Sequence, residues 1–216
     1  DLRDPRKADA LFRRYKPETV LHLAARVGGV KTNALQNADF FRDNVLINTN
    51  VLAAAGKHKT SRLISLLSSC AFPFYADRAT TEKDLHRGTP YPGNLGYGSA
   101  KRMLDVQTRL LWEQYGCHFT TVTPVTMYGP FDNWDLEDSH VLSALIHKCF
   151  HAKVKKKPLE VWGSGNAVRQ FVFAGDVAQI LLLTLGGIKE PGTLLIAPDP
   201  GLRIKDLVAV LVKVMK

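Results

Sequence analysis

Tyr97 and Lys101 stand four residues apart in the stretch YPGNLGYGSAKRMLD, where turn-forming residues give way to a helical pattern. Residues four apart lie on one face of a helix, so the phenol and the ammonium group would be neighbours. A lysine cation beside a phenol stabilises the phenolate and lowers the phenol pKa from its usual value of ~10. The pair alone is equally consistent with a tyrosine packed under a solvated lysine, so its meaning depends on the surrounding residues.

Ser68 supplies a third polar group near this pair. It follows the apolar run RLISLL, at the predicted end of a buried strand, and a long polar loop separates it from Tyr97. A serine hydroxyl can hold a carbonyl oxygen against the phenol while the phenol delivers a proton and a hydride reaches the carbon. The three side chains are therefore suited to the reduction of a ketone.

Alternating strands and helices must position these residues. The three- and four-residue spacing of apolar side chains predicts helices, and short apolar runs bounded by turn formers predict strands buried on both faces. This alternation predicts an α/β fold, with a parallel sheet covered by helices on both faces. Helices are expected over Pro5–Tyr15, Asn37–His58, Ser99–Tyr115 (capped by Gly116) and the amphipathic segment LRIKDLVAVLVKVMK, and strands at Thr19–Ala25, RLISLLSS and HFTTVTPVTMYG.

Ligands of parallel sheets bind beyond the carboxyl ends of the strands. Those ends fall at Ala24–Gly29, Ser68–Phe72 and Pro124–Pro130, so we expect one pocket there. After Pro130 the alternation becomes less regular, which indicates a smaller lobe on the substrate side.

Composition narrows the class of protein. The chain has 216 residues, 45% of them hydrophobic and 23% charged, which is enough for one domain with a sizeable core. No apolar run could span a bilayer and no signal peptide opens the sequence, so we expect no membrane partner. The sequence has three cysteines, Cys70, Cys117 and Cys149. So few cysteines argue against a disulfide framework and predict a reducing, cytoplasmic location. Their spacing is not that of metal ligands, so we expect no metal.

The net charge of +9 raises the question of nucleic acid. Much of it lies in the run Lys153–Lys157, which is most simply a solvated loop. No basic patch is interleaved with stacking aromatic residues, and cationic surface also suits a small molecule that carries a pyrophosphate. We therefore expect no nucleic-acid partner.

The motifs resemble the extended short-chain dehydrogenase/reductase superfamily, which acts on nucleotide sugars. Ser68, Tyr97 and Lys101 match its catalytic triad, and RQFVFAGDVAQ matches its late strand–loop signature. A narrower resemblance, to the GDP-L-fucose synthase family, covers nearly the whole chain and rests on HLAARVGGV, SSCAFP, YGSAKRMLDVQ, YGPFDNW, SHVLSALIHK and VWGSGNAVRQF. It implies epimerisation of GDP-4-keto-6-deoxy-D-mannose at the two carbons beside the ketone, followed by reduction of the ketone with NADPH.

The resemblance also implies roles for further residues. Ser68 and Tyr97 would hold the enolate oxygen, and Cys70 and His140 would exchange the protons beside the ketone. For Cys70, burial as a small apolar side chain is the alternative. The substrate would be bound by Val27, Gly28, Gly29, Lys148, Trp162 and Arg169. For the last three, the alternatives are a solvated lysine, a core tryptophan and a surface ion pair.

The cofactor implied by the family is NADP(H), in a Rossmann-like domain. Two positions depart from the family pattern: Thr126 replaces an asparagine near the cofactor, and Lys148 replaces an arginine and so lacks a bidentate fork. The cofactor-binding residues implied are Asp1, Leu2, Ala24, Ala25, Leu66, Leu67, Ser68, Ser69, Tyr97, Lys101, Pro124, Val125, Thr126, Met127 and His140.

The family pattern also sets expectations for domains and assembly. Residues 1–130 would form the dinucleotide-binding domain and residues 131–216 mainly the substrate lobe, with late sheet elements near residues 169–180. No glycine-rich strand-to-helix turn occurs in the sequence, so we expect the first strands to precede Asp1, part of the C-terminal lobe to be missing, and this piece alone to bind NADPH poorly and to be inactive. Apolar residues on both long helices, 37–58 and 99–115, predict a homodimer.

Two other readings compete with this one. Another nucleotide-sugar epimerase or dehydratase would share the triad, but a dehydratase usually has threonine and acidic residues where this chain has SSCAF. A non-catalytic relative that binds RNA or acts as a scaffold would have lost the serine, tyrosine or lysine, and all three are present.

Overall fold

The computed structural model of the protein describes residues 1–74, 78–136, 138–188 and 190–215. Its centre is a parallel sheet of four strands in the order β1-β2-β3-β7. The strands are β1 (Thr19–His22), β2 (Arg62–Leu66), β3 (Phe119–Pro124) and β7 (Thr193–Ile196). The first of these is shorter than predicted, because its pairing with β2 ends where His22 meets Ser65.

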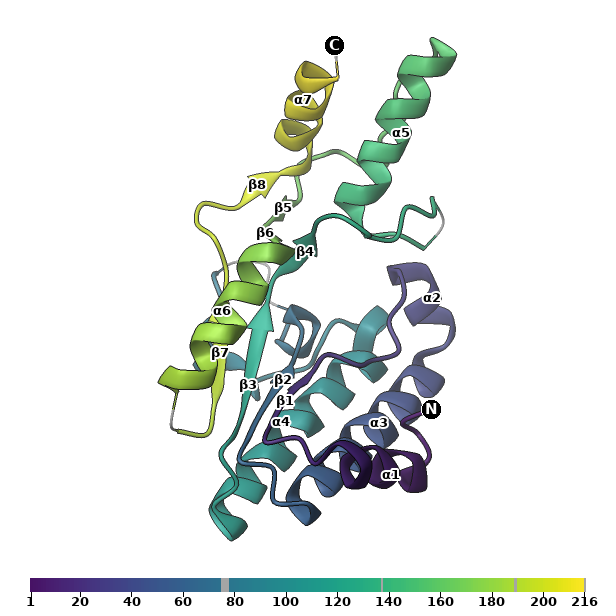
Figure 1. Ribbon diagram of the computed structural model, residues 1–216. Coiled ribbons are helices and arrows are strands. Elements are labelled where there is room, and N and C mark those ends of the chain that lie inside the picture. The colour runs from purple at the N-terminus through teal and green to yellow at the C-terminus, as the bar shows by residue number, and fades with distance from the viewer. Residues whose placement is uncertain (75–77, 137, 189, 216) are drawn as a thin grey trace.

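Helices cover both faces of the sheet, which confirms the predicted α/β class (Figure 1). Leu63 and Ile64 are neighbours in β2, are both fully buried, and belong to two different apolar clusters. Because neighbouring strand residues point to opposite faces, both faces of this strand are covered by apolar cores. One face carries α1 (Pro5–Tyr15), α3 (Asn37–Lys57) and α4 (Leu95–Tyr115), and the other carries α6 (Ala174–Gly187).

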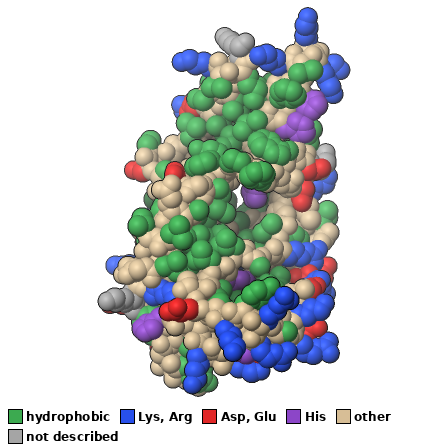
Figure 2. Space-filling view, in the orientation of Figure 1, with side chains coloured by type: hydrophobic (Ala, Val, Ile, Leu, Met, Phe, Trp, Pro, Cys, Tyr) green, Lys and Arg blue, Asp and Glu red, His purple; other side chains and the backbone are tan. Residues whose placement is uncertain are grey.

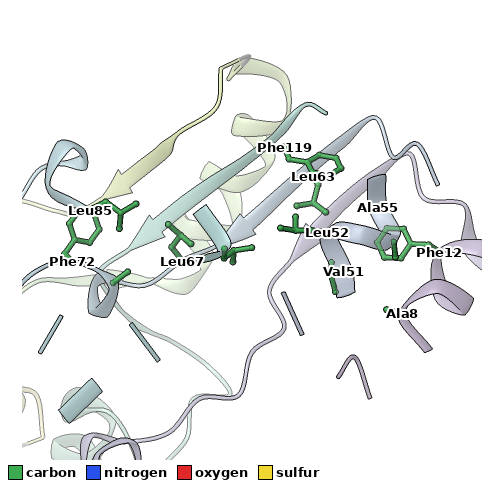
Figure 3. Packing of buried hydrophobic residues seen from close by; sticks show 13 residues of the cluster. Ala8, Phe12, Val51, Leu52, Ala55, Leu63, Leu67, Phe72, Leu85 and Phe119 are labelled. Atoms are coloured by element: carbon green, nitrogen blue, oxygen red, sulfur yellow. The ribbon is translucent and has the colours of Figure 1, made fainter. Parts of the chain in front are cut away.

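The larger core lies between the sheet and the first three of these helices. Figure 3 shows Ala8 and Phe12 of α1 beside Val51, Leu52 and Ala55 of α3, with the sheet residues next to them. Each large side chain buried in this way contributes about 1.5–3 kcal/mol to the free energy of unfolding. This core holds α3 and α4 against the sheet and so fixes where α4 begins.

The helix ends follow the sequence signals. Asp4 caps α1 by accepting a hydrogen bond from the Arg6 amide at 2.9 Å, with Pro5 in the first turn. Gly116 ends α4 in the left-handed conformation with φ of 65°, as predicted for a C-cap. The basic run at 153–157 differs from its prediction, because Lys153 and Lys155 form the last turn of a helix, where cations are favourable, and not a loop.

The segment HFTTVTPVTMYG was expected to be one strand, and the structure divides it in two. Pro124 lacks an amide donor, so the β3 ladder ends there. The chain continues as β4 (Thr126–Tyr128), which pairs in parallel with β6 (Phe171–Phe173) in a separate sheet. The chain therefore leaves the four-stranded sheet after β3 and enters the smaller lobe that follows residue 130 in the sequence.

The second lobe is small and mostly helical, and lies at the top of Figure 1. Its core joins α5 to α7 through buried leucine and isoleucine side chains. Strand β7 follows residue 130 in the sequence but belongs to the four-stranded sheet of the larger domain. The predicted domain boundary at residue 130 therefore stays a prediction. The remaining elements are α2 (Val30–Leu35), α5 (Val141–Lys155), β5 (Val168–Arg169), β8 (Leu202–Arg203), α7 (Ile204–Val214) and three 3-10 turns, η1 (Ser69–Ala71), η2 (Glu82–Asp84) and η3 (Pro92–Asn94).

On the face shown in Figure 2, most lysine and arginine side chains lie toward the two ends of the molecule. In Figure 2, lysine and arginine gather over α1 and α3 at one end of the molecule and at the tips of α5 and α7 at the other. Between the two ends, hydrophobic side chains cover much of the face shown. Within the described ranges, no helix is both long and apolar enough to cross a bilayer.

His22 should make the stability of the fold depend on pH. It is 4% exposed, and its Nε2 lies 3.0 Å from Asn48 Oδ1. Burial lowers the pKa of His22 from 6.5 to about 4. Between these two values the unfolded chain binds a proton that the folded chain does not, so stability falls as pH falls from 6.5 to 4.

We expect this histidine to account for a loss of about 3 kcal/mol in the free energy of unfolding between pH 7 and pH 4. Urea unfolding at several pH values measures it. His22→Gln should remove this part of the dependence, and His118→Gln, at an exposed position, should keep it. A His22→Gln protein with the wild-type pH dependence would contradict the assignment.

Candidate active site

Ser68 lies just beyond β2, at the carboxyl edge of the sheet. Its Oγ accepts a hydrogen bond from the Cys70 amide at 3.2 Å and so caps the η1 turn. Because the strands are parallel, the residues after β1 and β3 meet at the same edge. This places the predicted cofactor residues Ala24, Ala25, Leu66, Leu67, Ser69, Pro124 and Val125 around one end of the sheet.

Tyr97 lies in the first turn of α4, which begins at Leu95, earlier than predicted. Two glycines let this turn approach the neighbouring backbone. A Cβ on Gly98 would lie 2.3 Å from Cys70 O, and one on Gly96 would lie 2.0 Å from Asn37 O. Any larger residue at these positions would push the tyrosine away from the Ser68 turn.

Lys101 occupies the next turn of α4, on the same face as Tyr97. Its side chain is buried, its Nζ donates a hydrogen bond to Leu66 O at 2.6 Å, and the same atom lies 5.8 Å from the centre of the Tyr97 ring. Burial lowers the pKa of Lys101 from 10.5 to about 8. The four-residue spacing therefore brings the two groups together, and the lysine is not a solvated one.

The acidity of Tyr97 differs from the prediction. Burial raises the pKa of Tyr97 well above its usual value, and the nearby Cys70 raises it further, while the hydrogen bond with Ser68 acts in the opposite direction. The expectation of a lowered pKa was wrong, because removal from water disfavours the phenolate more than the neighbours favour it. A phenol that keeps its proton is suited to donate that proton to a developing oxyanion.

Cys70 adjoins this group of residues. It is half-buried and accepts a hydrogen bond at Sγ from Asn94 Nδ2 at 3.3 Å. The chemical role of Cys70 stays a prediction. Asn94 was not predicted as a site residue, although its position in the turn-forming run YPGN was visible in the sequence.

The glycines of the loop Val27–Gly29 lie close to their neighbours, so a side chain at either position would be crowded. A Cβ on Gly29 would lie 3.0 Å from Asp138 Oδ1 and 3.2 Å from the Asp138 main chain, and one on Gly28 would lie 3.0 Å from the Phe40 ring. Asp138 Oδ1 accepts hydrogen bonds from Gly29 N and Thr32 Oγ1, each at 2.7 Å. Sequence reasoning missed Asp138, although it stands two residues before His140.

His140 is the N-cap residue just before α5 and is exposed, with no side-chain hydrogen bond to the helix. Further along this helix, Lys148 Nζ lies 3.7 Å from the centre of the Trp162 ring, a cation–π contact. Trp162 is 68% exposed, which excludes the alternative of a core tryptophan. Arg169 is exposed in β5, where its Nη1 donates to the adjacent Val168 O at 2.8 Å.

Four further predicted cofactor-binding residues lie outside the loops at the carboxyl edge of the sheet. Asp1 forms an ion pair with Arg3 at 2.5 Å, and Leu2 O accepts a hydrogen bond from Asn50 Nδ2 at 2.8 Å. Thr126 and Met127 lie in β4. Among the described side chains, no group of three or more histidines, cysteines and carboxylates is placed to hold a metal ion.

Comparison with known proteins places this arrangement in a family. Residues 1–197 match the model of the NAD dependent epimerase/dehydratase family. The chain is 38% identical over its whole length to a GDP-L-fucose synthase of Dictyostelium discoideum, covering 68% of that protein. Over 92% of its length it is 37% identical to a probable GDP-L-fucose synthase of Drosophila melanogaster, covering 64% of it.

Solved structures agree with the sequence relatives. A GDP-L-fucose synthetase from Naegleria fowleri, in a structure bound to NADP, superposes with a TM-score of 0.88 at 33% identity. The match covers all of this chain and 67% of that one, so the chain spans about two thirds of the length of the relatives it matches. The protein belongs to the NAD dependent epimerase/dehydratase family, in the group that includes the GDP-L-fucose synthases.

Proposed function

We propose that the protein is an NADPH-dependent epimerase-reductase that converts GDP-4-keto-6-deoxy-D-mannose into GDP-L-fucose. The observation that carries the proposal is the position of Cys70, in the turn that follows Ser68 and close enough to Tyr97 to influence its ionisation. A simple ketone reductase needs the Ser–Tyr–Lys group but has no use for a thiol beside it. An enzyme that also moves the protons next to the ketone does need such a group.

The residues at the sheet edge fit a nicotinamide cofactor. A lysine ammonium carries three N–H donors, and Leu66 O takes one of those of Lys101, which leaves donors for a ribose hydroxyl. When bound, NADPH supplies the hydride for the reduction. Ser68 and Tyr97 would hold the ketone oxygen, and Tyr97 would give it a proton as the hydride arrives.

The epimerisation would use Cys70 and His140. Removal of a proton beside a ketone is feasible because hydrogen-bond donors stabilise the enolate oxygen, a role that Ser68 and Tyr97 fill before reduction. Cys70 and His140 would then take up and return the protons at the two flanking carbons. The GDP group of the substrate would contact Lys148, Trp162 and Arg169, which lie on the second lobe.

A direct turnover experiment tests this proposal. The full-length protein is incubated with GDP-4-keto-6-deoxy-D-mannose and NADPH, with NADPH oxidation followed by absorbance and the product analysed by NMR. GDP-L-fucose is the expected product. Production of a sugar reduced without epimerisation would replace the proposal with a simple reductase, and salt-sensitive RNA retention on filters without turnover would favour the non-catalytic alternative.

We further infer a cytoplasmic homodimer built on α3 and α4. Phe41 and Leu46 of α3 and Met103 and Leu110 of α4 are 40% to 53% exposed, an apolar surface that a second copy would cover. Other apolar residues of these helices, such as Leu104, are buried in the core instead and do not contribute to the interface.

Light scattering at micromolar concentration should therefore give the mass of a dimer. Leu110→Glu should reduce it to that of a monomer, since a buried unpaired carboxylate is costly. Leu182→Glu is the matched control, because Leu182 is similarly exposed, at 61%, but lies on α6. A monomeric wild-type protein, or a Leu110→Glu dimer, would refute the proposed interface.

A further inference from the structure

The segment between the two lobes that leads to His140 is organised by its own polar side chains. Asn133 N donates to Asp132 Oδ1 at 2.8 Å and Asp135 N donates to Asn133 Oδ1 at 3.0 Å. Asp138 N then donates to Asp135 Oδ1 at 3.0 Å. These short-range contacts shape the segment but do not connect it to the sheet domain.

Asp138 makes the connection across the lobes. Its carboxylate accepts hydrogen bonds from Gly29 N and Thr32 Oγ1 at 2.7 Å each, although Gly29 is 109 residues away in the sequence. The hydrogen bond from Thr32, the one from Gly29 and the nearby His140 all lower the pKa of Asp138, so it is an ionised acceptor at neutral pH. A Cβ at Gly29 would crowd Asp138, at 3.0 Å from its Oδ1 and 3.2 Å from its main chain.

We propose that Asp138 is a positioning residue for epimerisation, which holds the segment carrying His140 against the loop Val27–Gly29. This inference rests on the proposed function, because it assigns to Asp138 the placement of a group that moves a substrate proton. Asp138 Oδ1 accepts one hydrogen bond from Gly29, in the predicted substrate loop, and one from Thr32, in α2. Loss of the carboxylate would let the His140 segment shift relative to the sheet edge that holds Ser68 and Tyr97.

The expected effect is specific to one half of the reaction. In Asp138→Ala, exchange of a substrate proton beside the ketone should fall about 10- to 100-fold, the range expected when a catalytic group is misplaced by about 1 Å. Reverse hydride transfer, from GDP-L-fucose to NADP+, does not require epimerisation and should proceed at close to the wild-type rate. Asp138→Asn should restore most of the loss, because its amide oxygen can accept the same two hydrogen bonds.

Three measurements on the full-length protein test the proposal. Deuterium incorporation from heavy water reports proton exchange, the burst of NADPH formed from GDP-L-fucose and NADP+ reports hydride transfer, and amide hydrogen exchange by NMR reports the Gly29 N–H. Asp138→Ala should lose proton exchange, keep the hydride burst, and expose the Gly29 amide. Thr32→Val should weaken proton exchange and the protection of the Gly29 amide by a smaller amount and should also keep the hydride burst. Asp206→Asn, at the exposed ion pair between Asp206 of α7 and Arg203, should change none of the three.

The outcomes separate this inference from the proposed function. A wild-type protein that does not exchange substrate protons would remove the proposed function, and the Gly29 amide would still show whether Asp138 holds the loop. If the wild type is active and Asp138→Ala exchanges both protons at the normal rate, the positioning role is wrong. Equal loss of proton exchange and of the hydride burst would also overturn it, since it would indicate a general structural role.

Discussion

Tyr97→Phe should abolish ketone reduction while some exchange of the substrate protons persists. The phenol gives the ketone oxygen its proton during hydride transfer, and loss of a positioned acid of this kind costs about 10²- to 10⁴-fold in rate. Because burial raises the pKa of Tyr97, its hydroxyl is held in the protonated form that this role requires. Ser68 remains as a donor to the enolate oxygen, so proton exchange at the flanking carbons should be weakened and not lost.

The measurement for this variant combines NADPH oxidation with deuterium incorporation into the substrate. Tyr115→Phe is the matched control, since Tyr115 ends the same helix and is 67% exposed. Its rates should equal those of the wild type. Reduction by Tyr97→Phe at more than about a tenth of the wild-type rate would rule out Tyr97 as the proton donor.

Cys70→Ser should have the opposite effect, with epimerisation lost and hydride transfer kept. The substitution nearly preserves the size of the side chain but replaces a thiol, whose thiolate is a good proton acceptor, with a far less acidic hydroxyl. Proton exchange beside the ketone should therefore fall by about a hundredfold or more. Asn94 Nδ2 donates a hydrogen bond to the Cys70 Sγ and can donate one to a serine Oγ at the same position, so the turn should keep its shape.

The control for this variant is Cys117→Ser, at a half-buried cysteine near the start of β3, away from the carboxyl edge of the sheet. It should leave both steps unchanged. Reverse hydride transfer from GDP-L-fucose should survive in Cys70→Ser, which would show that the cofactor site is intact. If Cys70→Ser exchanges both protons at the normal rate, Cys70 is a packing residue and the epimerase half of the proposal fails.

Much of the fold and the centre of the site follow from local sequence patterns. The spacing of Tyr97 and Lys101 predicts their contact because helix geometry alone fixes it. The same holds for the helix over Pro5–Tyr15, which the structure confirms residue for residue, and for the C-cap at Gly116. Ser68 was identifiable because a buried strand ends just before it.

Other features depend on tertiary contacts that no local pattern encodes. The hydrogen bond from Gly29 to Asp138 spans 109 residues, and nothing near Asp138 in the sequence indicates its partner. The raised pKa of Tyr97 reflects the burial of its side chain, whereas spacing reports only its nearest charged neighbour. The break after β3 was missed because Pro124 stands within a run of strand-forming residues.

Incubation of the full-length wild-type protein in heavy water with GDP-4-keto-6-deoxy-D-mannose and NADPH tests the central claim most directly. The account predicts GDP-L-fucose that carries deuterium at both carbons beside the former ketone, with one NADPH oxidised for each sugar reduced. Reduced sugar without deuterium at these carbons would contradict it, because Cys70 and His140 would then have moved no proton.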